Sequence, residues 1–319
     1  ALEVPVEKIP YIRTIEGRKF RAGKWEFPDS AITKLQQYGL IDANIKIPKK
    51  EIVHYELSPH LRKYQKDIVN KALNEGSYGI FADTGTGKTL MGLEIAKHYG
   101  KTLILCPLSV IETAWVDDCK KFYPELEITN CWATSSKKRF DAIDIDSDVY
   151  VMNYESFKIL KNKILAMDFQ CVIVDESQVM KNMGAQITNE LLQLIDVITH
   201  RFVLSGTPTP NHNSEIFPQM KFVDADIFGN NFFGFQAHYF TQDMQNPHRW
   251  YQTQENKEAY FNRLREKSVF LEKEDCVDLP PKVFQIKEFD LGSEQKRHYN
   301  NMVKNIKDNI NEWSKFEFT

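Results

Sequence analysis

Eight consecutive residues, Ala82–Thr89 (Ala-Asp-Thr-Gly-Thr-Gly-Lys-Thr), have the types and spacing of a loop that binds phosphate groups. Glycine at Gly85 and Gly87 allows backbone N–H groups to approach a phosphate chain closely, and Lys88 supplies positive charge for its β- and γ-phosphates. The Thr89 hydroxyl is a ligand for Mg²⁺. The run departs from the strict pattern only at Ala82, where glycine is usual, and the alternative reading is a Gly/Thr-rich hairpin turn. The segment predicts a nucleoside triphosphate site.

A pair of acidic residues, Asp175 and Glu176, comes 87 positions after Lys88 and follows the apolar run Cys171–Val174. Such a run is typical of a buried strand in a parallel sheet, and these sheets bind ligands at the carboxyl ends of their strands. Asp175 would hold the metal ion, and Glu176 would orient or deprotonate the attacking water. The alternative is an acidic pair that opens a surface helix. Together with the phosphate loop, the pair predicts an ATPase site.

The segments that must position these residues alternate between strand-like and helix-like patterns. The phosphate loop lies between an apolar strand candidate, Tyr78–Phe81, and a helix candidate, Leu90–His98. Further strands are expected at Thr102–Cys106, Glu127–Trp132, Val149–Met152 and Arg201–Leu204. Further helices are expected at Leu108–Phe122, Lys137–Ile143, Tyr154–Ala166 and Ile187–Ile195. This alternation predicts a doubly wound α/β domain with a mainly parallel sheet.

The composition is that of a soluble globular protein. The 319 residues are 42% hydrophobic and 27% charged, no apolar run approaches the roughly 20 residues that cross a bilayer, and no secretory signal is evident. The five cysteines form no C-x-x-C pair, which favours reduced thiols in a cytoplasmic protein. The net charge is −3, but residues 1–50 carry ten Lys/Arg against six Asp/Glu and the remainder 31 against 38. Nucleic-acid contacts would therefore need local basic patches.

The order of these motifs resembles that of the SNF2-type ATPases of helicase superfamily 2. Leu61–Gln65 resembles the family's LRPYQ segment, Asp83–Thr89 its DEMGLGKT, and Asp175–Gln178 its DEAH. The resemblance covers about residues 55–300 and implies a RecA-like lobe that binds ATP and Mg²⁺, with the metal on Thr89 and Asp175 and catalysis by Lys88, Asp175 and Glu176. The residues that it assigns to ATP binding are Arg62, Gln65, Asp83, Thr84, Gly85, Thr86, Gly87, Lys88 and Thr89. Among them, Gln65 would read the adenine edge.

Three further segments resemble family motifs that contact DNA or couple that contact to ATP: Leu105–Ser109, Val151–Glu155 and Leu204–Asn211. The DNA contacts implied are Pro107, Leu108, Ser109, Asn153, Tyr154 and Thr207. The coupling residues implied are Gln178, Ser205, Gly206 and Thr207. At Ser177 and Gln178 this chain departs from the Ala and His that are usual in the family. A general DEAD-box or AAA+ chain would not explain the downstream matches at Asp226–Gly229 and Leu279–Lys282.

The first 50 residues indicate a separate small α+β module. Arg18–Phe20 and Lys24–Pro28 suggest a hairpin, which an amphipathic helix ending near Gly39 would follow. The pattern resembles the HARP-type substrate domain that accompanies annealing-helicase motors. The residues that would contact DNA through phosphates and stacking are Arg18, Lys19, Lys24 and Trp25. In the alternative reading, the aromatic residues pack the module onto the motor.

The resemblance also divides the chain into expected domains. These are a HARP-like module at 1–50, a RecA-like ATP-binding lobe at 51–212, a helical insertion at 213–282, and a linker or start of the second lobe at 283–319. The last part should contain a strand at Val283–Phe289 and a helix at Ser293–Trp313. The second RecA-like lobe, with its arginine finger, would follow in a longer protein. The 319 residues alone should bind ATP but turn it over slowly, because loss of an arginine finger costs roughly 10³–10⁵ in rate.

The function implied by the resemblance is an ATP-driven translocase or helicase on duplex or forked DNA, of the fork-remodelling or strand-annealing type, with little sequence preference. Two alternatives stay open: a nucleotide-gated DNA-binding module without motor activity, and an RNA-directed superfamily 2 helicase. No membrane partner is expected. Lys, Asn and Ile are abundant, which indicates a low-GC bacterial or phage genome. The cytoplasm of a bacterium or of a phage host is therefore the expected location.

Overall fold

The computed structural model describes residues 19–21, 24–26, 31, 35, 40, 52–246, 249–276 and 290–316, with the backbone alone at 19–21, 24–26, 275 and 307–316. The chain divides into two units, residues 1–277 and 278–319. Among the described helices, none combines the length and the apolar character that would be needed to cross a bilayer. None of the five cysteines forms a disulfide within the part of the chain that the structure describes.

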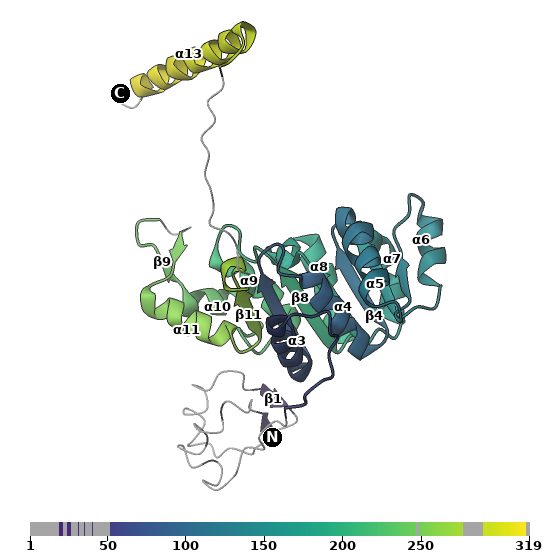
Figure 1. Cartoon of the computed structure of the whole chain (residues 1–319). Coiled ribbons are helices and arrows are strands. Elements are labelled where there is room, and N and C mark those ends of the chain that lie inside the picture. The colour runs from purple at the N-terminus through teal and green to yellow at the C-terminus, as the bar shows by residue number, and fades with distance from the viewer. Residues whose placement is uncertain are drawn as a thin grey trace. The chain divides into compact units, whose positions relative to one another are not determined.

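Seven parallel strands form the central sheet of the first unit (Figure 1). The strands are β3 (Tyr78–Ala82), β4 (Thr102–Cys106), β5 (Ile128–Asn130), β6 (Val149–Asn153), β7 (Cys171–Asp175), β8 (His200–Ser205) and β11 (Ser268–Leu271). Their order across the sheet is β11-β3-β8-β7-β4-β6-β5. β8 lies between β3, which leads into the phosphate loop, and β7, which ends in the acidic pair. The loops that follow these three strands therefore meet at one edge of the sheet.

Both faces of the sheet are buried, and successive residues of a strand point to opposite faces. In β7, Val172 and Val174 belong to one hydrophobic core, whereas Cys171 and Ile173 belong to the other. The helices that pack in the second core are α3 (Lys63–Glu75), α4 (Lys88–Tyr99) and α5 (Asp117–Phe122). Those that pack in the first core include α7 (Tyr154–Ala166), α8 (Gln186–Leu192) and α9 (Ile216–Val223). The expected doubly wound α/β fold is thus confirmed.

The helix expected at Leu108–Phe122 is built from three shorter pieces. A 3-10 turn, η3 (Leu108–Val110), is followed by a π-helical segment, η4 (Ile111–Val116), and then by α5. π-Helical segments are rare and occur frequently at functional sites. This one carries Trp115 toward the end of β7, as described below. The remaining short elements of the lobe are α6 (Ser136–Ile143), η5 (Ser177–Met180), η6 (Gln193–Asp196) and η7 (Asn213–Glu215).

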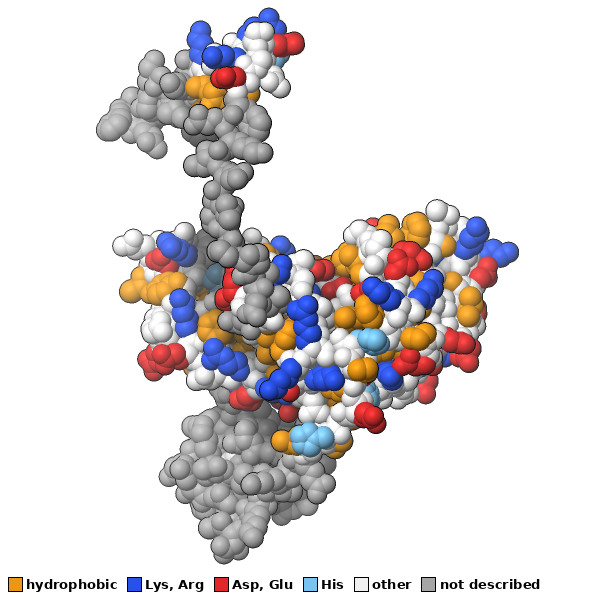
Figure 2. All heavy atoms as spheres, viewed as in Figure 1, with side chains coloured by type: hydrophobic (Ala, Val, Ile, Leu, Met, Phe, Trp, Pro, Cys, Tyr) orange, Lys and Arg blue, Asp and Glu red, His pale blue; other side chains and the backbone are white. Residues whose placement is uncertain are grey.

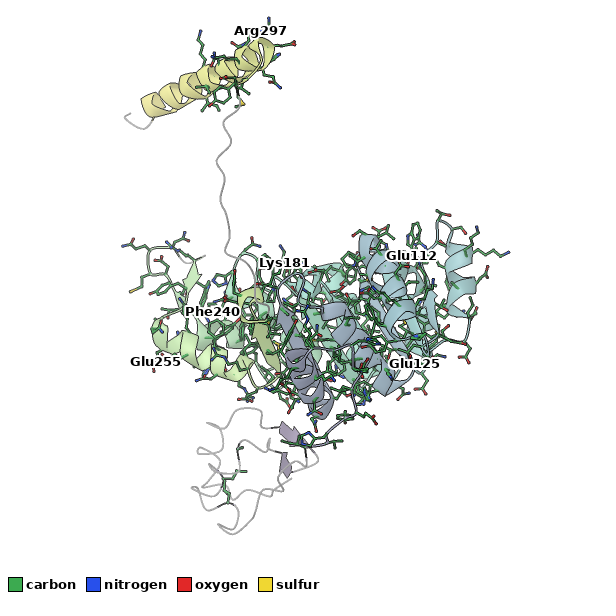
Figure 3. The ribbon with its side chains drawn as sticks, in the orientation of Figure 1. Glu112, Glu125, Lys181, Phe240, Glu255 and Arg297 are labelled. Carbon is green, nitrogen blue, oxygen red and sulfur yellow. The ribbon has the colours of Figure 1, made fainter. Side chains whose placement is uncertain are left out.

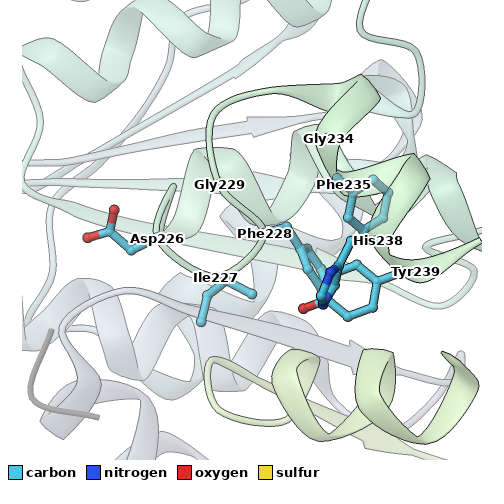
Figure 4. A pocket seen from close by; sticks show the side chains of 8 residues that line it. All are labelled: Asp226, Ile227, Phe228, Gly229, Gly234, Phe235, His238 and Tyr239. Atoms are coloured by element: carbon cyan, nitrogen blue, oxygen red, sulfur yellow. The ribbon is translucent and has the colours of Figure 1, made fainter. Parts of the chain in front are cut away.

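Residues 213–276 fold around an aromatic cluster beside the sheet. The elements after α9 are α10 (Phe232–Tyr239), a hairpin of β9 (Thr241–Gln242) and β10 (Trp250–Tyr251), α11 (Gln254–Leu264), β11 and α12 (Lys273–Cys276). In the cluster, Phe228 stacks on Tyr260 and Phe235 packs against both. A cavity of about 240 Å³ borders it (Figure 4). Phe240 and Glu255 mark this end of the unit in Figure 3.

The helical insertion that we expected at 213–282 is not helical throughout. Ser268–Leu271 forms β11, which pairs in parallel with β3 and becomes an edge strand of the main sheet. The pairing begins where the N–H of Gly79 donates to the carbonyl of Lys267 (2.9 Å). An ion pair between Lys267 and Glu75 (2.8 Å) ties the same point to α3. The lobe therefore takes its seventh strand from sequence beyond the expected boundary at 212.

The described residues at the two ends of the chain form a short hairpin and one helix. β1 (Lys19–Arg21) and β2 (Lys24–Glu26) form an antiparallel hairpin in which Phe20 lies opposite Trp25, at the place where a hairpin was expected. Of the amphipathic helix expected after it, the structure describes only Ala31 and Leu35, both buried. In the second unit, α13 (Ser293–Phe316) contains the helix expected from Ser293, and the expected strand Val283–Phe289 lies outside the described residues.

Candidate active site

The phosphate loop joins β3 to α4, as its sequence predicted. Gly85 and Gly87 have φ angles of 87° and 81°, a left-handed backbone conformation that favours glycine. At Gly87 there is a second constraint, because a Cβ would lie only 2.2 Å from Nε2 of Gln65. Thr84 and Gly85 are exposed at the crest of the loop, whereas Thr86 is buried. The crest of the loop thus lies at the surface, and its two glycines leave room for a ligand to approach the backbone.

The Lys88 ammonium group connects the phosphate loop to the segment after β8. Its Nζ donates to the carbonyls of Ala82 (2.6 Å) and Asp83 (3.3 Å). A Cβ built on Gly206 would lie 3.6 Å from both Lys88 Nζ and the Ala82 carbonyl oxygen, and 3.8 Å from the Thr84 nitrogen. Gly206 therefore stands directly beside the loop. This contact brings together two motifs that are more than a hundred residues apart.

Gln65, expected to read adenine, braces the phosphate loop from α3. Its Nε2 donates to the Thr86 carbonyl (2.9 Å), and its Oε1 accepts from the Arg62 N–H (2.7 Å). The Tyr64 hydroxyl donates to the same Thr86 carbonyl (2.8 Å). The loop is thereby held by two side chains of α3, and Arg62 itself is exposed at the start of that helix. Tyr64 is part of the Leu61–Gln65 motif, but the family resemblance implies no role for it.

Asp175 is buried at the end of β7, with 8% of its surface exposed. Its Oδ2 accepts from Nε1 of Trp115 (3.1 Å) and its Oδ1 from the Glu176 N–H (2.9 Å). Burial raises the pKa of Asp175 to about 6, and the negative charge of Glu176 adds to the rise, while these hydrogen bonds and the charge of Lys88 oppose it. The Trp115 indole packs directly against Gly92 of α4. A side chain at position 92 would leave no room for it, because a Cβ there would lie 2.7 Å from Cη2 of Trp115.

A chain of hydrogen bonds leads from the acidic pair to the segment after β8. The Gln178 Nε2 donates to Glu176 Oε2 (2.9 Å), and the Ser205 hydroxyl donates to Gln178 Oε1 (2.6 Å). The same hydroxyl accepts from the N–H of Thr207 (3.0 Å). Glu176 has φ 52°, and it alone among the described non-glycine residues has a positive φ. The glutamine at position 178 thus spans the distance to Ser205 directly.

A second, fully buried link joins the same two loops. The Ser177 hydroxyl donates to Gln219 Oε1 (2.7 Å), and Gln219 Nε2 donates to the carbonyls of Pro208 (2.7 Å) and Glu215 (3.1 Å). Ser177 and Gln219 are both 0% exposed. Gln219 lies on α9, outside every motif that we had recognised. A lone glutamine among apolar helix residues was the one sequence signal that could have pointed to it.

The residues expected to contact DNA fall into two groups. Leu108 and Ser109 are exposed after β4, with Pro107 half-buried before them, and Thr207 is exposed after β8. The other two point inward: Oδ1 of Asn153 accepts from the Ser156 N–H (3.0 Å) and caps α7, while the Tyr154 hydroxyl donates to the carbonyl of Asp175. One polar atom of each of these two side chains is thus used within the fold, and the DNA contacts expected of Asn153 and Tyr154 stay predictions.

The DNA contacts expected in the first 50 residues are not located by the structure. Lys19, Lys24 and Trp25 belong to the β1–β2 hairpin, of which only the backbone is described, and Arg18 lies outside the described residues.

Comparison with known proteins agrees with this arrangement. Residues 52–318 match the SNF2-related domain. The chain belongs to this family. It is 34% identical over 179 residues to the Caenorhabditis elegans homologue of SWI/SNF-related matrix-associated actin-dependent regulator of chromatin subfamily A-like protein 1, covering 54% of this chain and 26% of the relative. It is 27% identical over 274 residues to mouse DNA annealing helicase and endonuclease ZRANB3, covering 82% of this chain and 25% of the relative.

Among solved structures, the fold is similar to the Sulfolobus solfataricus SWI2/SNF2 ATPase core in complex with double-stranded DNA. The TM-score is 0.59 with 21% sequence identity, over 82% of this chain and 56% of that chain. The fold is therefore the RecA-like α/β fold of the SWI2/SNF2 ATPase core. This chain spans about a quarter of the length of the two relatives above and little more than half of the solved core.

Proposed function

We propose that this chain is the ATP-binding half of an ATP-driven motor that moves on DNA. The observation that carries the proposal is the hydrogen-bonded path from Glu176 through Gln178 and Ser205 to Thr207. In the proposed reaction, one end of this path orients the attacking water. The other end is an exposed residue where family resemblance expects DNA. A path of this kind lets DNA contact change the position of the catalytic acid.

The proposed chemistry follows from charges and donors on this edge of the sheet. The phosphate loop and Lys88 would hold the triphosphate, and Glu176 would accept a hydrogen bond from the water. The Thr89 hydroxyl, at the start of α4, and the Asp175 carboxylate form an oxygen-only donor set of the kind that Mg²⁺ prefers. Each Asp175 oxygen already accepts one hydrogen bond and keeps a second lone pair. When bound, Mg²⁺ would neutralise phosphate charge.

DNA is the proposed partner, and local contacts would dominate. Figure 2 shows Lys and Arg side chains interspersed with Asp and Glu over the visible face of the described lobe. An even mixture of signs gives a weak overall field, so few phosphates would be neutralised by this half alone. Phosphate contacts carry no sequence information, and slight sequence preference is therefore expected. The second RecA-like lobe, which we propose to follow in a longer protein, would supply further contacts and the arginine finger.

The test uses the intact protein with Glu176→Gln. A motor with this substitution binds ATP normally but loses ATP turnover and translocation, because the amide cannot act as a base. A nucleotide-gated binding module would keep its DNA-binding response to ATP, which is the outcome that rejects a motor. Forked, duplex and single-stranded DNA, with duplex RNA beside them, are compared as activators of the wild-type ATPase. Stronger activation by RNA would favour the RNA-directed alternative.

Gln178→Leu tests the path itself, with Gln186→Leu, at an exposed position of α8, as the matched control. We expect Gln178→Leu to lower DNA-stimulated turnover by at least tenfold while the ATP dissociation constant changes less than threefold, since the side chain contacts Glu176 and Ser205 but not the phosphate loop. Equal loss of basal and DNA-stimulated turnover would reject a coupling role. Gln186 donates only to Glu190 on its own helix, and its substitution should leave both rates unchanged.

A further inference from the structure

The end of β11 and the segment that follows it are hydrogen-bonded to the phosphate loop. In the β3–β11 register, Leu271 lies opposite Ala82, the last residue before the loop. One residue further, the Asp83 N–H donates to the Leu271 carbonyl (3.1 Å), and the Asp83 Oδ2 accepts from the N–H of Lys273 (3.0 Å). Asp83 therefore holds this segment with both its backbone and its carboxylate. The segment comes almost two hundred residues after the loop.

These two hydrogen bonds of Asp83 place the Lys273 side chain against the crest of the loop. A Cβ built on Gly85 would lie 3.6 Å from both Cε and Nζ of Lys273. The side chain is half-buried, and its ammonium group forms no hydrogen bond or ion pair with any residue that the structure describes. Lys88, by contrast, uses its ammonium group on the carbonyls of Ala82 and Asp83. The loop thus has a second ammonium group within reach of its exposed crest.

We propose that Lys273 is a second cationic contact to the phosphate chain of the bound nucleotide, supplied from outside the phosphate-loop motif. The inference rests on the proposed function, because it assumes that the loop binds a nucleoside di- or triphosphate. The physical reason is charge balance at the loop. The crest at Thr84 and Gly85 is exposed, and the ammonium group beside it has no anionic partner among the residues that the structure describes. A polyphosphate supplies that partner, with charge-assisted hydrogen bonds to lysine.

The position of Lys273 also gives the contact a consequence for the fold. Lys273 begins α12, directly after the strand that closes the sheet edge. A phosphate chain bound by both Lys88 and Lys273 would join the loop to this edge strand more firmly. We therefore expect nucleotide to protect the β11 amides from hydrogen exchange, and the protection to depend on the Lys273 charge.

The experiment measures nucleotide affinity of the 319-residue chain by calorimetry, with ATP, ADP and adenosine. Lys273→Met keeps the aliphatic length and removes the charge, while Lys273→Arg keeps the charge. We expect Lys273→Met to weaken ATP and ADP binding about five- to thirtyfold, as one charge-assisted contact would, and Lys273→Arg to weaken it less than about threefold. Adenosine binding should not change. The control is Lys257→Met on α11, an exposed lysine away from the loop, which should bind all three ligands as the wild type does.

Two outcomes overturn the inference. One is Lys273→Met binding ATP and ADP with wild-type affinity, and the other is an equal loss for adenosine, which would indicate damage to the fold. Thermal melting of each variant identifies such damage independently, and Lys273→Gln repeats the test if the methionine variant is unstable. Lys88→Ala separates this failure from failure of the proposed function. If Lys88→Ala binds ATP normally, the nucleotide site itself is misassigned; if only Lys273→Met does so, the second cationic contact alone is wrong.

Discussion

The buried link between Ser177 and Gln219 gives an unusual prediction: a second substitution should repair part of the damage done by the first. Ser177 donates to Gln219, and Gln219 donates to the Pro208 carbonyl. Gln219→Leu would leave two buried groups, the Ser177 hydroxyl and the Pro208 carbonyl, without these partners, and it would also remove a donor from the Glu215 carbonyl. Each orphaned buried group costs about 1–3 kcal/mol, so the first two together should cost this variant about 2–6 kcal/mol of stability. Ser177→Ala alone orphans only the Gln219 oxygen.

In the double variant, Ser177→Ala with Gln219→Leu, the orphaned hydroxyl is gone, and the groups affected are the carbonyls of Pro208 and Glu215, which lose the Gln219 amide. Adding Ser177→Ala to Gln219→Leu should therefore restore about 1–3 kcal/mol, although Ser177→Ala destabilises the wild type. Urea unfolding of the four proteins, followed by tryptophan fluorescence, measures the cycle. For a unit of this size, 1 kcal/mol corresponds to roughly 2–4 °C in melting temperature, which gives an independent reading. A double variant less stable than Gln219→Leu would refute the reasoning.

Two further predictions concern packing and pH. Gly92→Ala should destabilise the chain by about 1–3 kcal/mol, because the new Cβ collides with Trp115 and displaces the indole N–H from Asp175. This loss should exceed the gain from the higher helix propensity of alanine. A gain in thermal stability would contradict the prediction. Burial raises the pKa of Glu94, but the nearby His98 ring (3.4 Å) and hydrogen bonds from the Tyr123 hydroxyl and the Ser58 N–H outweigh it and hold that pKa below its usual range. The stability that Glu94 contributes is therefore present at neutral pH and lost as pH falls through its folded-state pKa, so Glu94→Gln should flatten the acid limb of a urea-unfolding series between about pH 6 and 3.

Much of the site could be predicted from the sequence because its residues stand at the ends of short apolar runs. In β3, β7 and β8, the runs are buried on both faces, and their length and order predict a parallel sheet. The carboxyl ends of such strands share an edge, so Lys88 and Asp175 were expected to meet, whereas Ser205 entered only through the family resemblance. Local pattern and chain order were sufficient for this part.

Contacts between side chains were beyond the sequence because they depend on long-range geometry. No periodic pattern in the sequence indicates the hydrogen bond from the Trp115 indole to Asp175. The same is true of the hydrogen bond between Ser177 and Gln219. β11 has only four residues, and its pairing with β3 depends on how the aromatic cluster returns the chain to the sheet. Tyr154 is a further example: the motif resemblance implies a DNA contact, and nothing in the sequence indicates the hydrogen bond from its hydroxyl to the Asp175 carbonyl.

The measurement that tests the central claim most directly is the Mg²⁺ dependence of ATP binding in Asp175→Asn, compared with Lys88→Ala and with the wild type. If the phosphate loop and the acidic pair hold one magnesium–nucleotide complex, Asp175→Asn should weaken binding of Mg²⁺-ATP at least tenfold but leave binding of metal-free ATP nearly unchanged, while Lys88→Ala weakens both. Asp175→Asn with a wild-type ratio of the two dissociation constants would contradict the claim, because the acidic pair would then serve a different site.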